Sequence, residues 1–311
     1  MQQAFVFPGQ GSQAVGMGKA LAEASVAARE VFGEVDEALS QNLTRLMFEG
    51  PGEELTLTEN AQPALMAVSL AVMAVLTRDC HLDLPSSARF VAGHSLGEYS
   101  ALAAAGAFSL ADASRLLRTR GQAMQAATPV GVGAMAAILG LDYDAVADIA
   151  AEAAGDDVCA AANDNAPGQV VVSGHKAAVE RATALATEKG ARRAVMLPVS
   201  APFHCSLMAP AADVMAKALA AATVQAPVVP LVANVKAEAV SDPDEIRDLL
   251  VAQVTGTVRW RESVLWMKAQ GVERLVEIGA GKVLSGLAKR IDPDIQCVAL
   301  NTPDDIDAFL K

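Results

Sequence analysis

A serine between two glycines, where an apolar strand-like run meets a helix-like run, constrains the fold of this chain most. The segment is GHSLG at residues 93–97, with a strand predicted over 89–92 and a helix over 98–106. A serine at such a sharp strand-to-helix turn is held in a strained conformation with its hydroxyl exposed. The glycines permit close backbone approach, and the helix N-terminus directs amide dipoles towards an oxyanion. Ser95 is therefore a candidate nucleophile; the alternative is a turn that only packs helix on strand.

Further strand-like runs alternate with helical patterns along the chain. The five predicted strands of this kind are residues 3–7, 89–92, 228–233, 274–278 and 297–300. Such alternation is typical of a mostly parallel sheet that helices cover on both faces. We therefore expect an α/β fold with a hydrolase-like large subdomain, formed by residues 1–130 and 200–311.

Residues 131–199 follow a different pattern and are expected to form a small inserted subdomain. The predicted order is strand, helix, strand, strand, helix, strand, which is the ferredoxin-like pattern. The strands are predicted over 134–139, 158–162, 169–173 and 193–199, the helices over 142–154 and 176–189, and a turn over 163–168. An insert of this kind would create a cleft between the two subdomains.

Composition limits the partners of the chain. It has 311 residues, a formal net charge of −12, and 52% hydrophobic against 19% charged residues. This is a globular chain whose acidity argues against nucleic acid, and it offers no polybasic run to a membrane surface. The N-terminus lacks the features of a signal peptide, and the most apolar run, 64–76, is shorter than the roughly 20 residues of a bilayer span. We expect a cytoplasmic protein without a membrane or nucleic-acid partner.

The cysteines offer no evident metal site. Cys80, Cys159, Cys205 and Cys297 are scattered without metal-ligand spacing, which fits a reducing compartment. We therefore expect no metal and no cofactor. Cys205 directly follows His204, but adjacent side chains diverge in most backbone conformations, so a thiol nucleophile is the less favoured interpretation.

A second glycine-containing segment, residues 9–14, follows the first predicted strand with the G-x-G-x-x-A spacing of dinucleotide-binding loops. That fingerprint needs a second strand about 20 residues later that ends in an acid. Residues 20–40 instead have the pattern of a polar helix. The favoured alternative is that the loop presents backbone amides, Gln10 foremost, to the nucleophile. An oxyanion hole needs two donors, and the other would be the amide of Leu96.

The nucleophile also needs a base, and the chain has four histidines: His81, His94, His175 and His204. The side chain of His94 is expected to point away from its neighbour Ser95, and His81 and His175 lie at predicted helix edges with polar neighbours. His204 follows the last strand of the insert, where the chain returns to the large subdomain, so elimination favours it. A triad would further require an acid to orient the imidazole. No acid stands out in a strand-end loop between Ser95 and His204, which weakens an ordinary hydrolase assignment.

Several separated motifs, in the same order, resemble the malonyl-CoA:acyl-carrier-protein transacylase family almost from end to end. They are FPGQGSQ at 7–13, GHSLGEYSAL at 93–102, RGQAMQ at 120–125, PGQVVVSG at 167–174, His204-Cys205, and GAGKVL at 279–284. The resemblance implies that Ser95 is the nucleophile and His204 its base. It also implies that the amides of Gln10 and Leu96 hold the oxyanion.

The resemblance further implies the residues that determine specificity and orientation. It makes Arg120 the partner of the malonyl carboxylate, and it makes the backbone carbonyl of Gln253 the group that orients the histidine in place of an acid. Asn163 and Asn165 match polar positions near the acyl pocket. Phe203 is expected to crowd an α-branched acyl group, which favours malonyl over methylmalonyl.

The implied reaction moves a malonyl group from malonyl-CoA to the phosphopantetheine thiol of acyl carrier protein, in fatty acid biosynthesis. It proceeds in ping-pong order through a malonyl-serine, and a Ser-His dyad can suffice because thiols, with a pKa near about 8.5, leave readily. Two alternatives stay open: a serine acyl-thioester hydrolase, and a non-catalytic carrier-protein-binding subunit. An acidic carrier would need a local basic patch, for which the candidates are Lys189, Arg192, Arg193, Lys289 and Arg290.

Overall fold

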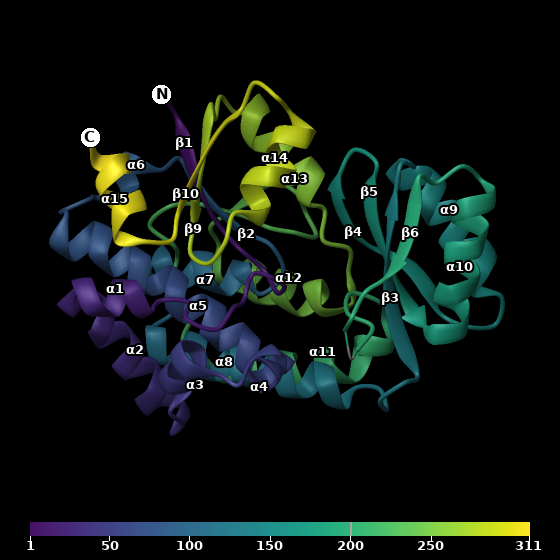
Figure 1. Ribbon diagram of the computed structural model, residues 1–311, viewed down its shortest axis with the longest axis horizontal. Coiled ribbons are helices and arrows are strands. Elements are labelled where there is room, and N and C mark those ends of the chain that lie inside the picture. Colours follow the sequence, from purple (N-terminus) through teal and green to yellow (C-terminus); the bar gives the residue numbers. More distant parts are fainter. Residues whose placement is uncertain (200) are drawn as a thin grey trace.

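Two sheets organise the computed structural model, which describes residues 1–199 and 201–311 (Figure 1). The larger sheet has the strand order β10-β9-β1-β2-β7-β8, and all its pairings are parallel except that of β7 with β8. Its strands are β1 (Gln3–Phe7), β2 (Phe90–Gly93), β7 (Leu231–Val232), β8 (Ala239–Val240), β9 (Arg274–Ile278) and β10 (Gln296–Leu300). The expected α/β class with a mostly parallel sheet is confirmed.

The pairing of β1 with β2 brings two predicted functional loops together. Phe7, the last residue of β1, lies opposite Gly93, the last residue of β2. Because the strands are parallel, the loops that follow them leave the same edge of the sheet. Gln10 and Ser95 therefore lie on neighbouring loops although they are far apart in the sequence.

The predicted strand 228–233 is wrong in its extent. Only Leu231–Val232 pair as β7, although the carbonyl of Pro230 still accepts from the Val91 amide at 3.0 Å. Proline has no amide hydrogen to donate to a ladder, so Pro227 and Pro230 prevent a longer strand.

Alternate side chains of the central strands enter two different cores. Phe5 and Phe7 of β1 pack into a large core, whereas Ala4 and Val6 pack into a smaller one on the opposite face. This is the alternation expected of a strand that is buried on both faces. The smaller core is completed by α13 (Trp260–Ala269) and α14 (Val283–Ile291).

The large core is built by the remaining helices around the sheet. They are α1 (Lys19–Ala24), α2 (Val26–Leu39), α3 (Leu43–Glu49), α4 (Gly52–Thr56), α5 (Thr58–Ala74), α6 (Leu84–Ser87), α7 (Gly97–Ala104), α8 (Leu110–Ala126), α11 (Ala209–Ala221), α12 (Pro243–Thr255) and α15 (Pro303–Leu310), with one turn of π-helix at Val75–Asp79 and one of 3₁₀-helix at Ser206–Met208. Residues 20–40 thus lie in α1 and α2, with no second strand to complete a dinucleotide-binding fingerprint.

One of these helices is long and apolar enough to cross a membrane by length and composition. It consists of α5 and the π-helical turn that follows it. Together they run over Thr58–Asp79, which extends beyond the predicted apolar run 64–76 at both ends. However, 83% of its most apolar window is buried inside the protein. It contacts α2, α7 and α8, which identifies it as the central helix of the large core.

The smaller sheet lies beside the larger one and has the antiparallel order β4-β5-β3-β6 (Figure 1). Its elements are β3 (Gly133–Leu139), α9 (Tyr143–Ala154), β4 (Cys159–Ala166), β5 (Gln169–His175), α10 (Lys176–Glu188) and β6 (Arg193–Met196). Both helices pack on one face. This order of elements is ferredoxin-like. We propose 131–199 as the limits of this subdomain; position 200, where the second part of the large subdomain is predicted to resume, lies outside the described residues.

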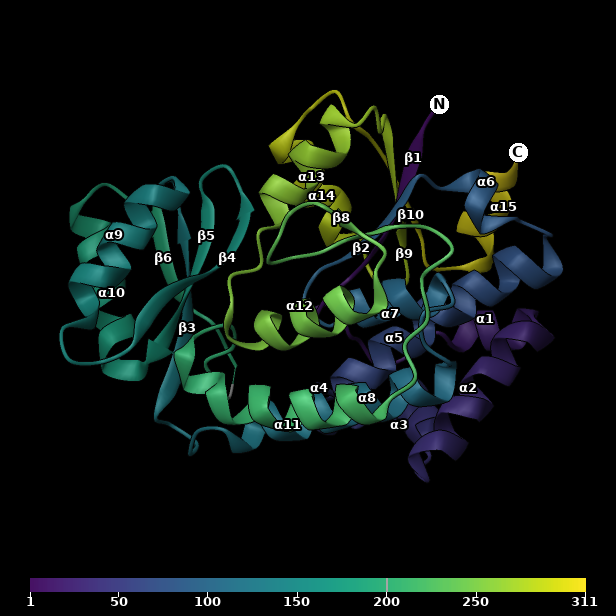
Figure 2. The ribbon, with the colours of Figure 1, turned by 180° about the vertical axis from the view of Figure 1, so that it is seen from behind.

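The predicted turn at 163–168 is too long, because β4 continues to Ala166 and the turn is confined to 167–168. Two register shifts within β4 keep it paired with β5. On its other edge, Val258 of the large subdomain donates to the Ala162 carbonyl and accepts from the Asp164 amide, each at 2.9 Å. Figure 2 shows the chain passing beside β4 on its way from α12 to α13. The small subdomain is therefore attached to the large one through β4.

Candidate active site

Ser95 lies on the turn between β2 and α7 and has a left-handed backbone, with φ of 53°. The turn is closed so tightly that both flanking positions exclude a side chain. A Cβ on Gly93 would lie 1.9 Å from the carbonyl carbon of Gly97, and a Cβ on Gly97 would lie 2.3 Å from the carbonyl oxygen of Phe7. The two glycines are thus required by the geometry that exposes the serine.

Two buried amide side chains hold this turn from outside. Asn234 Oδ1 accepts from the Ser95 amide at 2.8 Å, and Asn234 Nδ2 donates to the Gly93 carbonyl at 2.7 Å. Gln253 Nε2 donates to the Ser95 carbonyl at 2.9 Å. A non-glycine residue in such a conformation costs of order 1–3 kcal/mol and persists only where its surroundings fix it. Asn234 and Gln253 supply that fixation.

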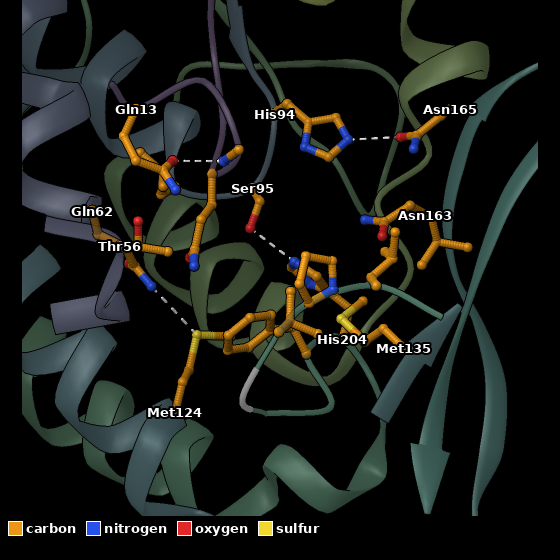
Figure 3. A pocket seen from close by; sticks show the side chains of 18 of the residues that line it. Gln13, Thr56, Gln62, His94, Ser95, Met124, Met135, Asn163, Asn165 and His204 are labelled. Atoms are coloured by element: carbon orange, nitrogen blue, oxygen red, sulfur yellow. Dashed lines mark hydrogen bonds between the residues drawn. The ribbon is translucent and has the colours of Figure 1, made fainter. Parts of the chain in front are cut away.

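His204 lies where a base for Ser95 is needed (Figure 3). Ser95 Oγ and His204 Nε2 are 2.8 Å apart, and His204 Nδ1 lies 2.9 Å from the carbonyl oxygen of Gln253. Since a carbonyl only accepts, the proton is assigned to Nδ1, which leaves Nε2 free to accept from the serine. Burial, together with the charge of Arg120, lowers the pKa of His204 to about 3. The imidazole is therefore neutral and able to take a proton.

Arg120 extends from α8 to Ser95 and is 1% exposed. Its Nη2 donates to Ser95 Oγ at 3.1 Å and to Gln253 Oε1 at 2.9 Å, and its Nη1 donates to Gln62 Oε1 at 2.9 Å. Burial lowers its pKa, but an arginine stays protonated in proteins. Among the described residues no carboxylate contacts the guanidinium directly, although the charge of nearby Glu98 acts on it, and its Nε has no hydrogen-bond partner. A buried cation surrounded by neutral acceptors is suited to an anionic ligand.

One cavity of about 470 Å³ unites the predicted site residues. Its lining includes Ser95, His204, Arg120, Gln10, Leu96, Asn163, Asn165 and Phe203. Gln253 lies behind His204 and is fully buried. The cavity lies between the two subdomains, because Asn163 and Asn165 belong to β4 whereas Ser95 follows β2.

The prediction that the His94 side chain points away from the site is wrong. His94 lines the same cavity, and its Nε2 lies 2.8 Å from Asn165 Oδ1 (Figure 3). Burial lowers its pKa, so the ring is neutral. This contact joins the two walls of the cavity. By contrast, His81 is exposed and His175 lies beside Asp157 at the far end of β5, away from the site.

The cysteines do not take part in the site. Cys205 is buried outside the cavity lining, its Sγ contacts the Pro202 carbonyl at 3.2 Å, and burial raises the pKa of its thiol. The four cysteines are free thiols. Within the described part of the chain no group of three His, Cys, Asp or Glu side chains could hold a metal ion.

Gln62 and Asn234 are functional candidates that the sequence analysis missed. Each carries a weak signal: Gln62 is a polar residue at the start of an apolar helix, and Asn234 comes directly after the strand-like run 228–233. A buried polar side chain in such a place needs partners. The partners of Gln62 and Asn234 come from distant segments of the chain, so only the folded structure identifies them.

The chain is similar over its length to several known proteins. The sequence model of the acyl transferase domain family matches residues 4–290. A malonyl CoA-acyl carrier protein transacylase of Escherichia coli K12 is 49% identical over all of this chain and 99% of its own length. A crystal structure of an acyl-carrier-protein-S-malonyltransferase from Bartonella henselae has 57% identity and a TM-score of 0.98, and covers 100% of this chain and 98% of its own. A solved complex of a type II PKS acyl-carrier protein with its malonyl-transacylase has 42% identity and a TM-score of 0.96, and covers 99% of this chain and 98% of that chain.

The low pKa of His204 predicts an unusual pH dependence of Ser95 reactivity. A histidine with the ordinary pKa of about 6.5 would be about 76% neutral at pH 7 and only about 3% neutral at pH 5, which would slow labelling roughly 25-fold. We expect the rate of Ser95 labelling by a fluorophosphonate to change less than about twofold over this range, as followed by intact-protein mass. Ser95→Ala serves as the unlabelled control, and a loss of roughly 25-fold at pH 5 would contradict the lowered pKa of His204.

Proposed function

This chain belongs to the acyl transferase family, and on that premise we propose that it moves a malonyl group from malonyl-CoA to the phosphopantetheine thiol of an acyl carrier protein, in fatty acid biosynthesis. It is an acyltransferase with no resident cofactor, since the residues of its cavity provide the base, the nucleophile and the anion partner. We propose a cytoplasmic location, which suits its four free thiols.

The observation that carries this proposal is the position of Arg120. Its guanidinium donates to the nucleophilic oxygen of Ser95 at 3.1 Å, and among the described residues no carboxylate contacts it directly. In a malonyl-serine the free carboxylate is separated from the ester carbonyl by one methylene group. A cation beside Ser95 is therefore placed for that carboxylate, and a bidentate arginine–carboxylate pair is among the stronger hydrogen-bonded contacts.

In the first half of the reaction Ser95 attacks the thioester carbonyl of malonyl-CoA. Its proton moves from Oγ to Nε2 of His204, while the Nδ1–H of His204 stays hydrogen-bonded to the carbonyl of Gln253. Gln10 and Leu96 line the same cavity, and their amides stabilise the tetrahedral oxyanion in the proposed reaction. One such donor contributes about 3–4 kcal/mol to lowering the barrier. CoA then leaves as a thiol with the proton that His204 carried.

In the second half the thiol of the carrier's phosphopantetheine attacks the malonyl-serine, and the same groups act in reverse. The attacking thiol gives its proton to His204, and His204 passes that proton to Ser95 Oγ as the ester bond breaks. A neutral histidine oriented by a carbonyl suffices because the groups exchanged are a thiol and the serine hydroxyl rather than an amine. Phe203 lines the acyl cavity and opposes an α-methyl branch, which favours malonyl over methylmalonyl.

The hairpin turn between β4 and β5 supports a basic docking surface for an acidic carrier. Arg290 at the end of α14 donates to Gln169 at 2.5 Å, and Gly168 packs on Gly140, which in turn contacts Arg192. Exposed arginines that are distant in sequence thus meet at one turn, with exposed Lys289 and Arg193 adjacent to them. We exclude Lys189 from this surface, because its charge is paired with Glu152.

Replacing Arg120 tests the proposed substrate. Arg120→Ala removes charge-assisted hydrogen bonds worth about 1.5–3 kcal/mol, so we expect formation of the malonyl adduct on Ser95 to slow roughly 10- to 150-fold. Acetyl transfer should rise relative to malonyl transfer, because acetyl has no carboxylate. Arg115→Ala is the matched control, since Arg115 lies exposed on the same helix.

Mass spectrometry after incubation with malonyl-CoA alone provides the readout. Unchanged malonyl loading in Arg120→Ala would contradict the role of the arginine. Absence of any adduct on Ser95 in the unmodified protein would instead favour a non-catalytic carrier-binding subunit, and release of free malonate in the presence of carrier protein would favour a hydrolase.

Charge reversal tests the docking surface. Arg192→Glu and Arg290→Glu should each raise the KM for carrier protein several-fold and leave the KM for malonyl-CoA unchanged, because interface charges act mainly on encounter. Arg78→Glu is a control of equal charge change on an arginine paired with Glu30, away from the hairpin. Equal effects on both substrates would count against the surface, and so would an equal effect of the control.

A further inference from the structure

Glu98 is a buried carboxyl group that the proposed reaction does not use. It lies in the first turn of α7, directly after the nucleophile turn, and is 1% exposed. Gln253 Nε2 and the backbone amide of Asn234 both donate to its carboxyl group. These donors favour the ionised carboxylate, whereas burial favours the neutral acid. The hydrogen bonds to Glu98 and its burial therefore act on its ionisation in opposite directions.

A single amide side chain connects Glu98 to Arg120. The Nε2 of Gln253 contacts the carboxyl group of Glu98, while its Oε1 accepts from Arg120 Nη2 at 2.9 Å. Glu98 and Arg120 are each 1% exposed and Gln253 between them is fully buried, so solvent screens the interaction between the two charged groups weakly. The charges of Glu98 and Arg120 act on each other across this bridge.

Few other charges face Glu98 from the elements that pack against α7. β1, β2 and β7 carry no charged residue, and α8 brings Arg120. The neighbouring Tyr99 has a buried hydroxyl whose pKa is raised by burial, so it stays neutral. α5 contributes Glu59 near its start, whose charge acts on Arg118. Arg120 is thus the cation with which both an ionised Glu98 and an anion bound in the cavity would interact.

We propose that Glu98 is a positioning residue whose ionised form competes with the malonyl carboxylate for the charge of Arg120, so that malonyl binding requires a neutral Glu98. This inference rests on the proposed malonyl transfer and adds to it a requirement on the ionisation state of Glu98. Two carboxylates that share one cation in a buried site cannot both ionise without a large cost. Where Glu98 is ionised, binding of a malonyl group takes up one proton from solvent onto its carboxyl oxygen.

The direction of the resulting pH dependence follows from the position of Glu98. Burial raises the pKa of Glu98 to about 8, while the hydrogen bonds from Gln253 and Asn234 and the charge of Arg120 oppose that increase. Because bound malonyl favours the protonated form, it raises this pKa further. The affinity for malonyl is therefore highest at pH values below the pKa of Glu98 in the unliganded protein, and it falls as the pH rises through that pKa.

The test is the second-order rate constant for acylation of Ser95, measured by quenched flow and intact-protein mass between pH 6.5 and about 9.5, without carrier protein. Acetyl-CoA serves as the matched donor without a carboxylate. For malonyl-CoA we expect a fall of up to about tenfold per pH unit above the pKa of Glu98, and for acetyl-CoA a level profile. Glu98→Gln keeps the size of the side chain but cannot ionise, so the malonyl profile should become level.

The outcomes separate this role from a structural one. A malonyl profile in Glu98→Gln that falls as in the unmodified protein overturns the proposal, and so does an acetyl profile that falls in parallel with malonyl. Glu98→Asp retains an ionisable group and should keep the alkaline fall; a level malonyl profile in this variant also overturns the proposal. If neither variant folds, the comparison of malonyl with acetyl in the unmodified protein decides. Absence of a malonyl adduct at every pH refutes the proposed function instead.

Discussion

The hydrogen bonds from Asn234 and Gln253 to the backbone of Ser95 are the interaction on which the site depends. They fix a left-handed serine between two glycines that cannot carry a side chain. Gln253 also orients His204 through its carbonyl and accepts from Arg120 through its side chain. Ser95, His204 and Arg120 are thereby held relative to one another by one residue of α12, so their geometry does not depend on flexible contacts.

The two subdomains form the cavity together because they are joined at several places along β4. The backbone pairing with Val258, the ion pair of buried Asp164 with Arg261 at 2.8 Å, and the contact between His94 and Asn165 all lie on this strand. Replacing a conventional triad acid by a carbonyl also keeps a further permanent charge out of the cavity. In such surroundings the charge of Arg120 remains available for the malonyl carboxylate of the proposed reaction.

The sequence allowed the class of fold and the ferredoxin-like order of the small subdomain to be predicted, because those features have local patterns. It also supplied the candidate site residues, whose roles stay predictions. β1 and β9 appear as apolar runs with the observed bounds, and the nucleophile turn has a five-residue motif. The extent of β4 and the orientation of His94 could not be predicted, since both are decided by partners far along the chain. The same holds for Asn234, whose partners lie on the turn around Ser95, and for Glu98, whose partner Gln253 lies on α12.

The central claim is that side chains outside the nucleophile turn, and not the turn alone, make Ser95 reactive. The most direct test is the rate at which malonyl-CoA acylates Ser95 in an Asn234→Ala variant that remains folded by circular dichroism. This change leaves the Ser95 amide and the Gly93 carbonyl without their partner, a loss of about 1–3 kcal/mol for a buried polar group. We predict that acylation slows at least about tenfold. An unchanged rate would show that the glycine turn holds the serine without help and would contradict the claim.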